Sequence, residues 1–362
     1  MNAENIIDKA ISGDEIKLQE ALYLWNDAPL SLLIASAHYL RQKKSNPEIV
    51  TWIIDRNVNI TNVCCSACLF CNFYTTERNP KAYITTIDEY KTKIDELLKI
   101  GGNQLLLQGG LHPRLGLEFY KNLFKDLKNL YPDIKLHALG PPEIVHISKI
   151  EGISYKETLT ELVKSGLDSL PGAGAEILSE RVRRIISKNK CSAKEWSDVM
   201  IEAHKLGITT SATMMYGHIE TIEERIQHLL TIRKIQSIKP KDSRGFISFT
   251  SWPFQQKNTA LAKRMELHPN FRSDEYLRLI AVSRLILNNI DNIQASWLTV
   301  GRELAQVCLH AGANDLSSIM IEENVVSAAG AGHKMGIAEM ENTIREAGFL
   351  PVRRDQQYNL MQ

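Results

Sequence analysis

Short apolar runs alternate with amphipathic segments along most of the chain. The segments between the runs repeat apolar residues at helical spacing, as 86–100 and 192–207 do. The runs themselves have the length and composition of buried strands. We therefore predict eight strands, at residues 58–63, 103–110, 135–140, 167–174, 209–217, 245–254, 293–301 and 314–321. Eight strands that alternate with helices predict an α/β fold, a (β/α)8 barrel of the TIM type.

The same pattern divides the chain into three parts. Residues 1–55 include two amphipathic stretches, 14–27 and 30–44, and predict an N-terminal helical extension that covers the bottom or side of the barrel. Residues 56–335 carry the eight predicted strands and form the barrel. Residues 336–362 predict a C-terminal extension with one helix and a short strand. No low-complexity linker interrupts the chain, so one core with extensions is favoured over two domains.

Composition and charge narrow the classes of partner. The 362 residues carry a formal net charge of +1, without a block of like charges. We therefore expect neither nucleic acid nor an anionic membrane as a partner. No apolar run is long enough to cross a bilayer, and the acidic N-terminus lacks the order of a signal peptide. These features predict a cytoplasmic protein, in which clustered cysteines act as ligands or redox groups.

Four of the six cysteines lie within eight positions. Cys64, Cys68 and Cys71 have the spacing C-x3-C-x2-C, and Cys65 is an extra. A zinc site needs four ligands, and without a second pair of cysteines it would borrow a distant histidine. Three thiolates from one loop favour an iron–sulfur cluster. A four-iron cluster held by three cysteines leaves one iron open, which is a catalytic feature. Cys65 is expected to pack as a small apolar residue.

Polar or aromatic residues follow the predicted strands. Because the active site of a TIM barrel lies at the carboxyl ends of its strands, these residues are candidates for the site. Any one of these residues is at least as often structural as functional. Eight of them at equivalent strand ends of one barrel, however, favour a functional site. They are Cys64, Gln108, His137, Glu176, His218, Trp252, Trp297 and Asp315.

The cysteine spacing, with Phe70 before the last cysteine, resembles that of the radical S-adenosylmethionine (SAM) enzymes, whose signature is C-x3-C-x-aromatic-C. The resemblance implies a [4Fe-4S] cluster on Cys64, Cys68 and Cys71, whose open iron binds SAM. It also implies cleavage of SAM to a 5′-deoxyadenosyl radical that takes a hydrogen atom from the substrate. Lys190 or Lys194 is the expected partner of the SAM carboxylate. The implied cofactor-binding residues are Phe70, Gln108, Gly109, Gly110, Glu176 and Lys190.

Longer motifs resemble one branch of these enzymes, the futalosine and deazaflavin branch. They include "LQGGLHP", "HALGPPEIVHISK", "GLDSLPGAGAEIL" and "ATMMYGHIET". Within the branch, "SWPFQQKNT" and "QASWLTVG" are similar to the cyclases of menaquinone biosynthesis. One departure is Arg244, which stands where these cyclases have a glycine. The alternatives are an aminofutalosine synthase or a deazaflavin-precursor synthase component and, in a different class, a non-catalytic iron–sulfur or zinc protein.

The resemblance implies a small-molecule substrate, dehypoxanthine futalosine, and an electron donor of the flavodoxin or ferredoxin type. The radical would take hydrogen from ribose C4′, and the sugar radical would then close on the aromatic ring. His218 and Asp315 are the candidate catalytic bases, although a structural role for His218 is equally expected. The candidate substrate-binding residues are His137, Tyr216, Glu220, Trp252, Trp297, Asn314 and Glu323.

Overall fold

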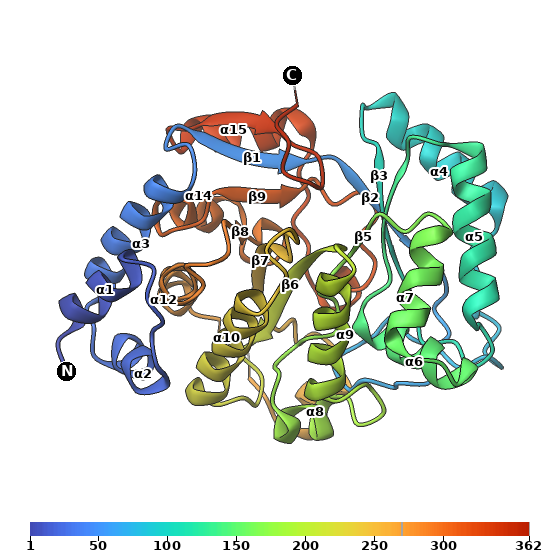
Figure 1. Ribbon diagram of the computed structural model, residues 1–362, viewed down its shortest axis with the longest axis horizontal. Helices are drawn as coiled ribbons and strands as arrows, with labels where there is room; N and C mark the ends of the chain where they lie inside the picture. The colour runs from blue at the N-terminus through green and yellow to red at the C-terminus, as the bar shows by residue number, and fades with distance from the viewer. Residues whose placement is uncertain (269–270, 362) are drawn as a thin grey trace.

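The computed structural model describes residues 1–268 and 271–361, and within them ten strands form a single parallel sheet. The order along the sheet is β10-β1-β9-β8-β7-β6-β5-β4-β3-β2. An isolated bridge between Arg56 and Ile321 joins β2 to the segment after β9, so the sheet curls into a TIM-type α/β barrel (Figure 1). The strands are β1 (Ile49–Ile53), β2 (Asp55–Asn59), β3 (Gln104–Gln108), β4 (Lys135–Ala138), β5 (Ser169–Leu170), β6 (Thr209–Tyr216), β7 (Phe246–Pro253), β8 (Asn292–Ala295), β9 (Asp315–Ser318) and β10 (Leu350–Arg353).

Strands β2 to β9 lie at or beside the eight predicted positions, so the predicted barrel is confirmed. The prediction for 293–301 is too long, because β8 ends at Ala295 and a short helix follows. Ser296 and Thr299 bond to each other through their hydroxyls there, and such local bonds compete with a strand ladder. Strand β1 was not predicted from the sequence. This strand lies between β9 and β10, and only Ile54 separates it from β2.

Helices cover the outside of the sheet, and several begin with capping boxes, such as Thr86 with Glu89 and Ser192 with Glu195. None of the helices in the described ranges is long and apolar enough to cross a bilayer. The helices are α1 (Ala3–Ile11), α2 (Leu18–Asn26), α3 (Leu30–Lys44), α4 (Ile87–Lys99), α5 (Leu117–Leu130), α6 (Pro141–Glu151), α7 (Tyr155–Lys164), α8 (Glu180–Ile186), α9 (Ala193–Lys205), α10 (Ile222–Ser237), α11 (Ala260–Arg264), α12 (Ser273–Ile286), α13 (Trp297–Val300), α14 (Arg302–His310) and α15 (Ile337–Glu346), with a 3₁₀ turn at Ser327–Ala329.

The N-terminal helices pack against the side of the barrel. Helix α3 contacts α12, and α2 contacts both α10 and α12 (Figure 1). At the other end of the chain, α15 and β10 follow the barrel, and β10 pairs with β1. Residues 49–53 and 350–353, which are about 300 positions apart in the chain, therefore lie side by side at one edge of the sheet.

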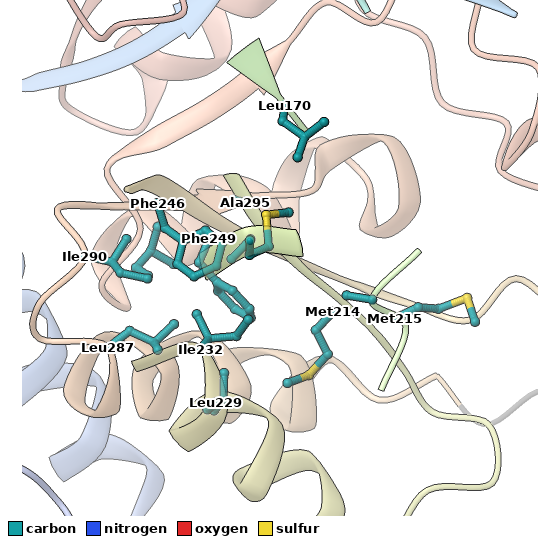
Figure 2. Close-up of a cluster of buried hydrophobic side chains, with 14 of the residues drawn as sticks. Leu170, Met214, Met215, Leu229, Ile232, Phe246, Phe249, Leu287, Ile290 and Ala295 are labelled. Carbon is teal, nitrogen blue, oxygen red and sulfur yellow. The ribbon is translucent and has the colours of Figure 1, made fainter. Parts of the chain in front are cut away.

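The core between β7 and helices α10 and α12 is apolar. Figure 2 shows Phe249 of β7 near Ile232 of α10, and both side chains are fully buried. The neighbouring residues Met214 and Met215 of β6 point to different sides, as successive residues of a strand do (Figure 2). Met214 packs in the core, whereas Met215 lines the cavity inside the barrel. One face of each strand therefore fills the core, and the other is available for a site.

Candidate active site

A cavity of about 390 Å³ runs down the inside of the barrel. Its mouth lies at the carboxyl ends of the strands, where the loop of residues 60–75 carries the three cysteines. Its inner end lies near the amino ends of the strands, where Arg354, Gln356 and Tyr358 enter from the segment after β10. The cavity therefore connects the cysteine loop with residues from the C-terminal end of the chain.

The side chains of Cys64, Cys68 and Cys71 line this cavity, whereas Cys65 does not. Cys65 is exposed, so the expectation that it packs as a small apolar residue is wrong. The backbone makes this distinction, because the Cys65 N–H donates to Leu111 O at 2.9 Å and the Leu111 N–H donates to Cys64 Sγ at 3.2 Å. Burial raises the pKa of each of the three cavity thiols. A metal that binds them therefore has to displace their protons.

The glycine turn after β3 packs directly on the cysteine loop. A Cβ atom added at Gly110 would lie 2.1 Å from the Val63 carbonyl oxygen and 2.8 Å from Cys64 Cβ. A Cβ at Gly109 would lie 3.2 Å from the Thr61 nitrogen. Neither glycine has a positive φ, so close approach alone explains why glycine stands at these two positions. Both glycines and the neighbouring Gln108 line the cavity.

A buried ion pair lies beside the cysteines. Lys190 Nζ is 2.6 Å from Glu176 Oε1, and the ammonium lies 5.4 Å from the centre of the Phe70 ring. Burial disfavours the charge of each partner, but their attraction outweighs it, so the pKa of Glu176 is lowered and that of Lys190 is raised. Both therefore stay charged at neutral pH. Lys194 is different, because it is exposed on α9 and pairs with Asp198.

Glu143 is a further carboxyl group of the cavity, and the sequence analysis did not select it. It lies in the first turn of α6, is buried and lines the cavity, and the backbone of Gly109 is one of the groups that lower its pKa against burial. Burial is the largest influence and raises its pKa to about 7. The motif "LGPPEI" gave no signal for it beyond a glutamate at a helix start, which is a common place for an acid.

These residues fit a cubane cluster with SAM. A cubane takes one thiolate on each of three irons, so the sulfurs need not meet at one point. A zinc ion, in contrast, needs its ligands around one point. No three His, Cys, Asp or Glu side chains converge in that way among the residues described in the structure. Glu176 and Lys190 offer opposite charges beside the thiols, which suits the ammonium and carboxylate groups of an amino acid.

The turn after β6 lies outside the cavity lining. His218 Nε2 is 3.1 Å from Met215 O, and its Nδ1 accepts from the Ile219 N–H at 2.7 Å. Glu220 accepts from the Gly217 and His218 N–H groups and pairs with Arg225. Within this arrangement both nitrogens of His218 are occupied by the backbone. The structure therefore gives the candidate base no access to the cavity.

Tyr216 is also absent from the cavity lining. It is buried, and its ring is stacked on Tyr276 with the centroids 6.3 Å apart. Its side chain points away from the lumen because its neighbour Met215 occupies the inward side of β6.

Asn314 and Asp315 are placed at the amino end of β9, not at its carboxyl end as the sequence analysis assumed. Arg354 donates to both oxygens of Asp315, from Nε at 2.5 Å and from Nη2 at 3.1 Å. Asn314 accepts from Arg284 Nη2 at 2.7 Å. Neither residue lines the cavity. Asp315 contacts two residues that do line the cavity, Arg354 and Ser317, whose N–H donates to Asp315 Oδ1 at 2.6 Å.

The other substrate-binding candidates do line the cavity. Trp252 and Trp297 lie on its wall, and Trp297 donates from Nε1 to Ser318 O at 3.0 Å. His137 lines it too, and burial lowers its pKa to about 3, so the ring is neutral. Glu323 lies near the mouth, where its carboxylate accepts from three backbone N–H groups, those of residues 325–327. That carboxylate is therefore committed to the backbone.

The inner end of the cavity was missed by the sequence analysis. Asp55, Asn57 and Asn59 lie at alternate positions of β2 and all line the cavity. The alternation in "DRNVN" was a readable signal for one polar face of a strand. Arg354 and Tyr358 had no comparable signal, because tertiary packing alone brings the C-terminal segment into the barrel. Arg244 does not line the cavity, and it donates instead to the backbone of Gln357.

Comparisons with known proteins agree with this geometry. The model of the radical SAM superfamily matches residues 58–232, and the model of the CofH/MqnC C-terminal region matches residues 243–362. The fold and the three-cysteine loop define a radical SAM enzyme. The chain belongs to the radical SAM superfamily and, within it, to the group that carries the CofH/MqnC C-terminal region.

Its relatives include two kinds of enzyme. The chain is 41% identical to a cyclic dehypoxanthine futalosine synthase of Streptomyces coelicolor, over 98% of this chain and 87% of that protein. It is also 41% identical to a 5-amino-6-(D-ribitylamino)uracil–L-tyrosine 4-hydroxyphenyl transferase of Methanosarcina mazei, over 98% of this chain and 91% of that protein. A solved methylornithine synthase shares the fold, with a TM-score of 0.71 at 18% identity over 96% of this chain and 97% of that chain.

Proposed function

We propose that this protein is a radical SAM cyclase that converts dehypoxanthine futalosine to cyclic dehypoxanthine futalosine in menaquinone biosynthesis. The observation that carries the proposal is a cavity that is continuous from the cysteine loop to the C-terminal segment, with Trp252 and Trp297 on its wall. A cyclase must hold two parts of one molecule against each other, and such positioning contributes strongly to rate. The two tryptophans offer flat apolar surfaces for the benzoate ring. The similarity to the Streptomyces coelicolor synthase supports the same activity.

In this proposal Cys64, Cys68 and Cys71 hold a [4Fe-4S] cluster, and Glu176 and Lys190 bind the amino and carboxylate groups of SAM. Once bound there and reduced by a flavodoxin or ferredoxin, the cluster and SAM would supply a 5′-deoxyadenosyl radical able to take the hydrogen atom from ribose C4′. Gly109 and Gly110 allow close approach at the mouth. The walls exclude water and hold the aromatic ring over the sugar, so that the new carbon–carbon bond forms. To restore aromaticity the ring would lose one proton to solvent or a base and one electron to the cluster that Cys64, Cys68 and Cys71 would hold, which donated one electron when SAM was cleaved.

The second candidate function is the transfer named for the Methanosarcina mazei relative. It is retained because the identity to that protein is the same, at 41% over 98% of this chain. Both functions use one radical at one site and differ in the acceptor. The motifs around Trp252 and Trp297 favour the cyclase.

Anaerobic turnover tests the proposal. Reconstituted protein is incubated with SAM, dithionite and, in separate reactions, dehypoxanthine futalosine, the enolpyruvyl benzoate used by aminofutalosine synthase, or ribitylaminouracil with tyrosine. The cyclase gives a product two hydrogens lighter, and deuterium at ribose C4′ appears in 5′-deoxyadenosine. Conversion of either other substrate, with dehypoxanthine futalosine untouched, contradicts the proposal. A stoichiometric zinc ion without iron uptake would contradict the radical chemistry as well.

A further inference from the structure

The inner end of the cavity is built from residues far apart in the chain. We call Asp55, Asn57, His137, Arg354, Gln356 and Tyr358 the cavity floor; all six line the cavity. Gln104 Nε2 donates to Gln356 Oε1 at 3.0 Å, and Gln294 Nε2 donates to Tyr358 Oη at 2.9 Å. The floor is thus held in place by β3 and β8 as well as by the C-terminal segment.

The floor carries no cation that is free to balance an anionic ligand. Arg354 is its only cation among the described residues that line this end, and its charge is already matched by Asp315. His137 is neutral, since burial lowers its pKa to about 3. Burial raises the pKa of Asp55, while Ser318 and Arg354 oppose this shift, and in either protonation state Asp55 adds no positive charge to the floor. A carboxylate placed here would be a buried charge without a partner, which is strongly unfavourable.

The floor does have mixed hydrogen-bonding capacity. Arg354 uses three N–H groups, two on Asp315 and one on Asp355 O, and a guanidinium has two more to donate. Tyr358 Oη accepts from Gln294 and keeps its own proton. Asn57 Oδ1 is a buried acceptor without a partner in the described chain. A hydroxyl both donates and accepts, whereas a carboxylate only accepts and would leave Asn57 unsatisfied.

We propose that the cavity floor is a recognition site for the neutral polyol end of the substrate, and that the C-terminal segment supplies part of it. The inference rests on the proposed function, in which this polyol is the ribose of dehypoxanthine futalosine. The hydroxyls of the ribose meet the floor, and the benzoate lies towards the tryptophans and the mouth. A site that hydrogen-bonds hydroxyls discriminates strongly against a ligand without them, because its own polar groups are then left unpaired.

Two adjacent glutamines make a matched pair for the test. Gln356 lines the cavity, whereas Gln357 points to Thr209, whose hydroxyl donates to its Oε1 at 2.8 Å. The holoenzyme and the variants Gln356→Ala and Gln357→Ala are titrated with two ligands, followed by tryptophan fluorescence. One ligand is dehypoxanthine futalosine, and the other is the same aromatic keto acid with a methyl group in place of the ribose.

We expect Gln356→Ala to weaken binding of the sugar-bearing ligand tenfold or more and binding of the sugar-free acid less than twofold. Gln357→Ala should change neither by more than twofold. Asn57→Ala repeats the test, since its Oδ1 makes no internal bond whose loss would disturb folding. Equal weakening of both ligands by Gln356→Ala and Asn57→Ala, or no weakening of either, overturns the proposal.

The outcome also separates this inference from the proposed function. If the protein converts dehypoxanthine futalosine and the floor variants bind it normally, the function stands and the floor site fails. If the protein ignores that compound but binds ribitylaminouracil, the cyclase proposal fails. In that case the polyol proposal still holds if Gln356→Ala loses affinity for ribitylaminouracil and Gln357→Ala does not. Unchanged affinity, or a wild-type protein that binds neither polyol, overturns it.

Discussion

Lys190 and Glu176 form an ion pair of 2.6 Å on the wall of the cavity, and the ammonium also lies over the ring of Phe70. Both charged groups are largely withdrawn from water, with side-chain exposures of 15% and 8%. The pair also lies close to the thiols. The charge of Lys190 therefore lowers the pKa of Cys68, although burial, which raises it, is the larger influence. The pair is therefore a charged feature close to the expected cofactor site.

Lys190→Met should raise the Kd for SAM at least tenfold. The variant removes the cation and leaves the carboxylate of Glu176 buried and alone, which costs about 3–5 kcal/mol. Isothermal titration with SAM on the reconstituted protein measures the change. Lys194→Met is the matched control, because that lysine is 81% exposed and should leave SAM binding unchanged. The reverse result would move the SAM carboxylate to Lys194.

Cys65→Ala should keep about four irons per chain, whereas Cys64→Ala, Cys68→Ala and Cys71→Ala should each lose the cluster and SAM cleavage. The reason is the backbone pairing with Leu111, which leaves Cys65 exposed and outside the cavity. Iron and sulfide analysis with EPR of the reduced protein measures the outcome. Loss of the cluster in Cys65→Ala, with retention in Cys64→Ala, would show that the register is wrong.

Gly110→Ala should lower the iron content after reconstitution. The new Cβ would meet the Val63 carbonyl at 2.1 Å, and a backbone group cannot rotate away as a side chain can, so the cysteine loop must shift. Gly332→Ala is the control, since its Cβ would meet nothing within 4 Å and its φ is not positive. Equal iron contents in the two variants would show that the loop tolerates the shift.

Glu143→Gln should stabilise the protein at pH 8 but not at pH 5. Burial raises the folded-state pKa from 4.5 to about 7, so the folded protein holds this proton more tightly than the unfolded chain does. The cost to the folded state begins as pH rises above 4.5 and is complete above pH 7. It amounts to roughly 3 kcal/mol. Thermal unfolding of both proteins at the two pH values measures it, and an equal difference in Tm at both would contradict the assignment.

Asp315→Asn should destabilise folding by about 3–5 kcal/mol, because it leaves the buried Arg354 without its anion. The double variant with Arg354→Met should recover part of this loss.

Neither Asp315→Asn nor His218→Gln should lower the ratio of product to 5′-deoxyadenosine, since neither side chain lines the cavity. Denaturant titration and product ratios test the two statements. A low product ratio in His218→Gln would restore it as the base.

The sequence predicted the barrel because its strands and helices have local patterns, such as the apolar run of β3 and the capping box of α4. The sequence also predicted the cluster ligands, because the C-x3-C-x2-C spacing by itself limits which metal cofactor the cysteines can hold. The sequence did not show which end of β9 carries Asp315. Asp315 follows the turn "GAN" and begins β9, so it lies at the opposite end of the barrel from Cys64.

Other parts of the site depend on contacts between distant residues. Arg354 reaches the cavity only because β10 pairs with β1, a strand that the short run "IVTWI" did not reveal beside the N-terminal helices. Glu143 is distinctive because it is buried under the glycine turn, and burial cannot be read from a glutamate in a helical first turn. Local pattern therefore predicts the scaffold and the cluster ligands, and tertiary packing decides the rest.

The pairing of β1 with β10 has a consequence for synthesis on the ribosome. Ile49 pairs with Leu350, so about 300 residues must be added before β1 meets this partner. At roughly 5–20 residues per second, that interval lasts roughly 15 to 60 s. Its other partner, β9, also comes late in the chain, so both edges of β1 are unpaired for most of that interval. The nascent chain therefore passes through a prolonged stage with an exposed strand edge, in which binding by a chaperone would protect it from aggregation.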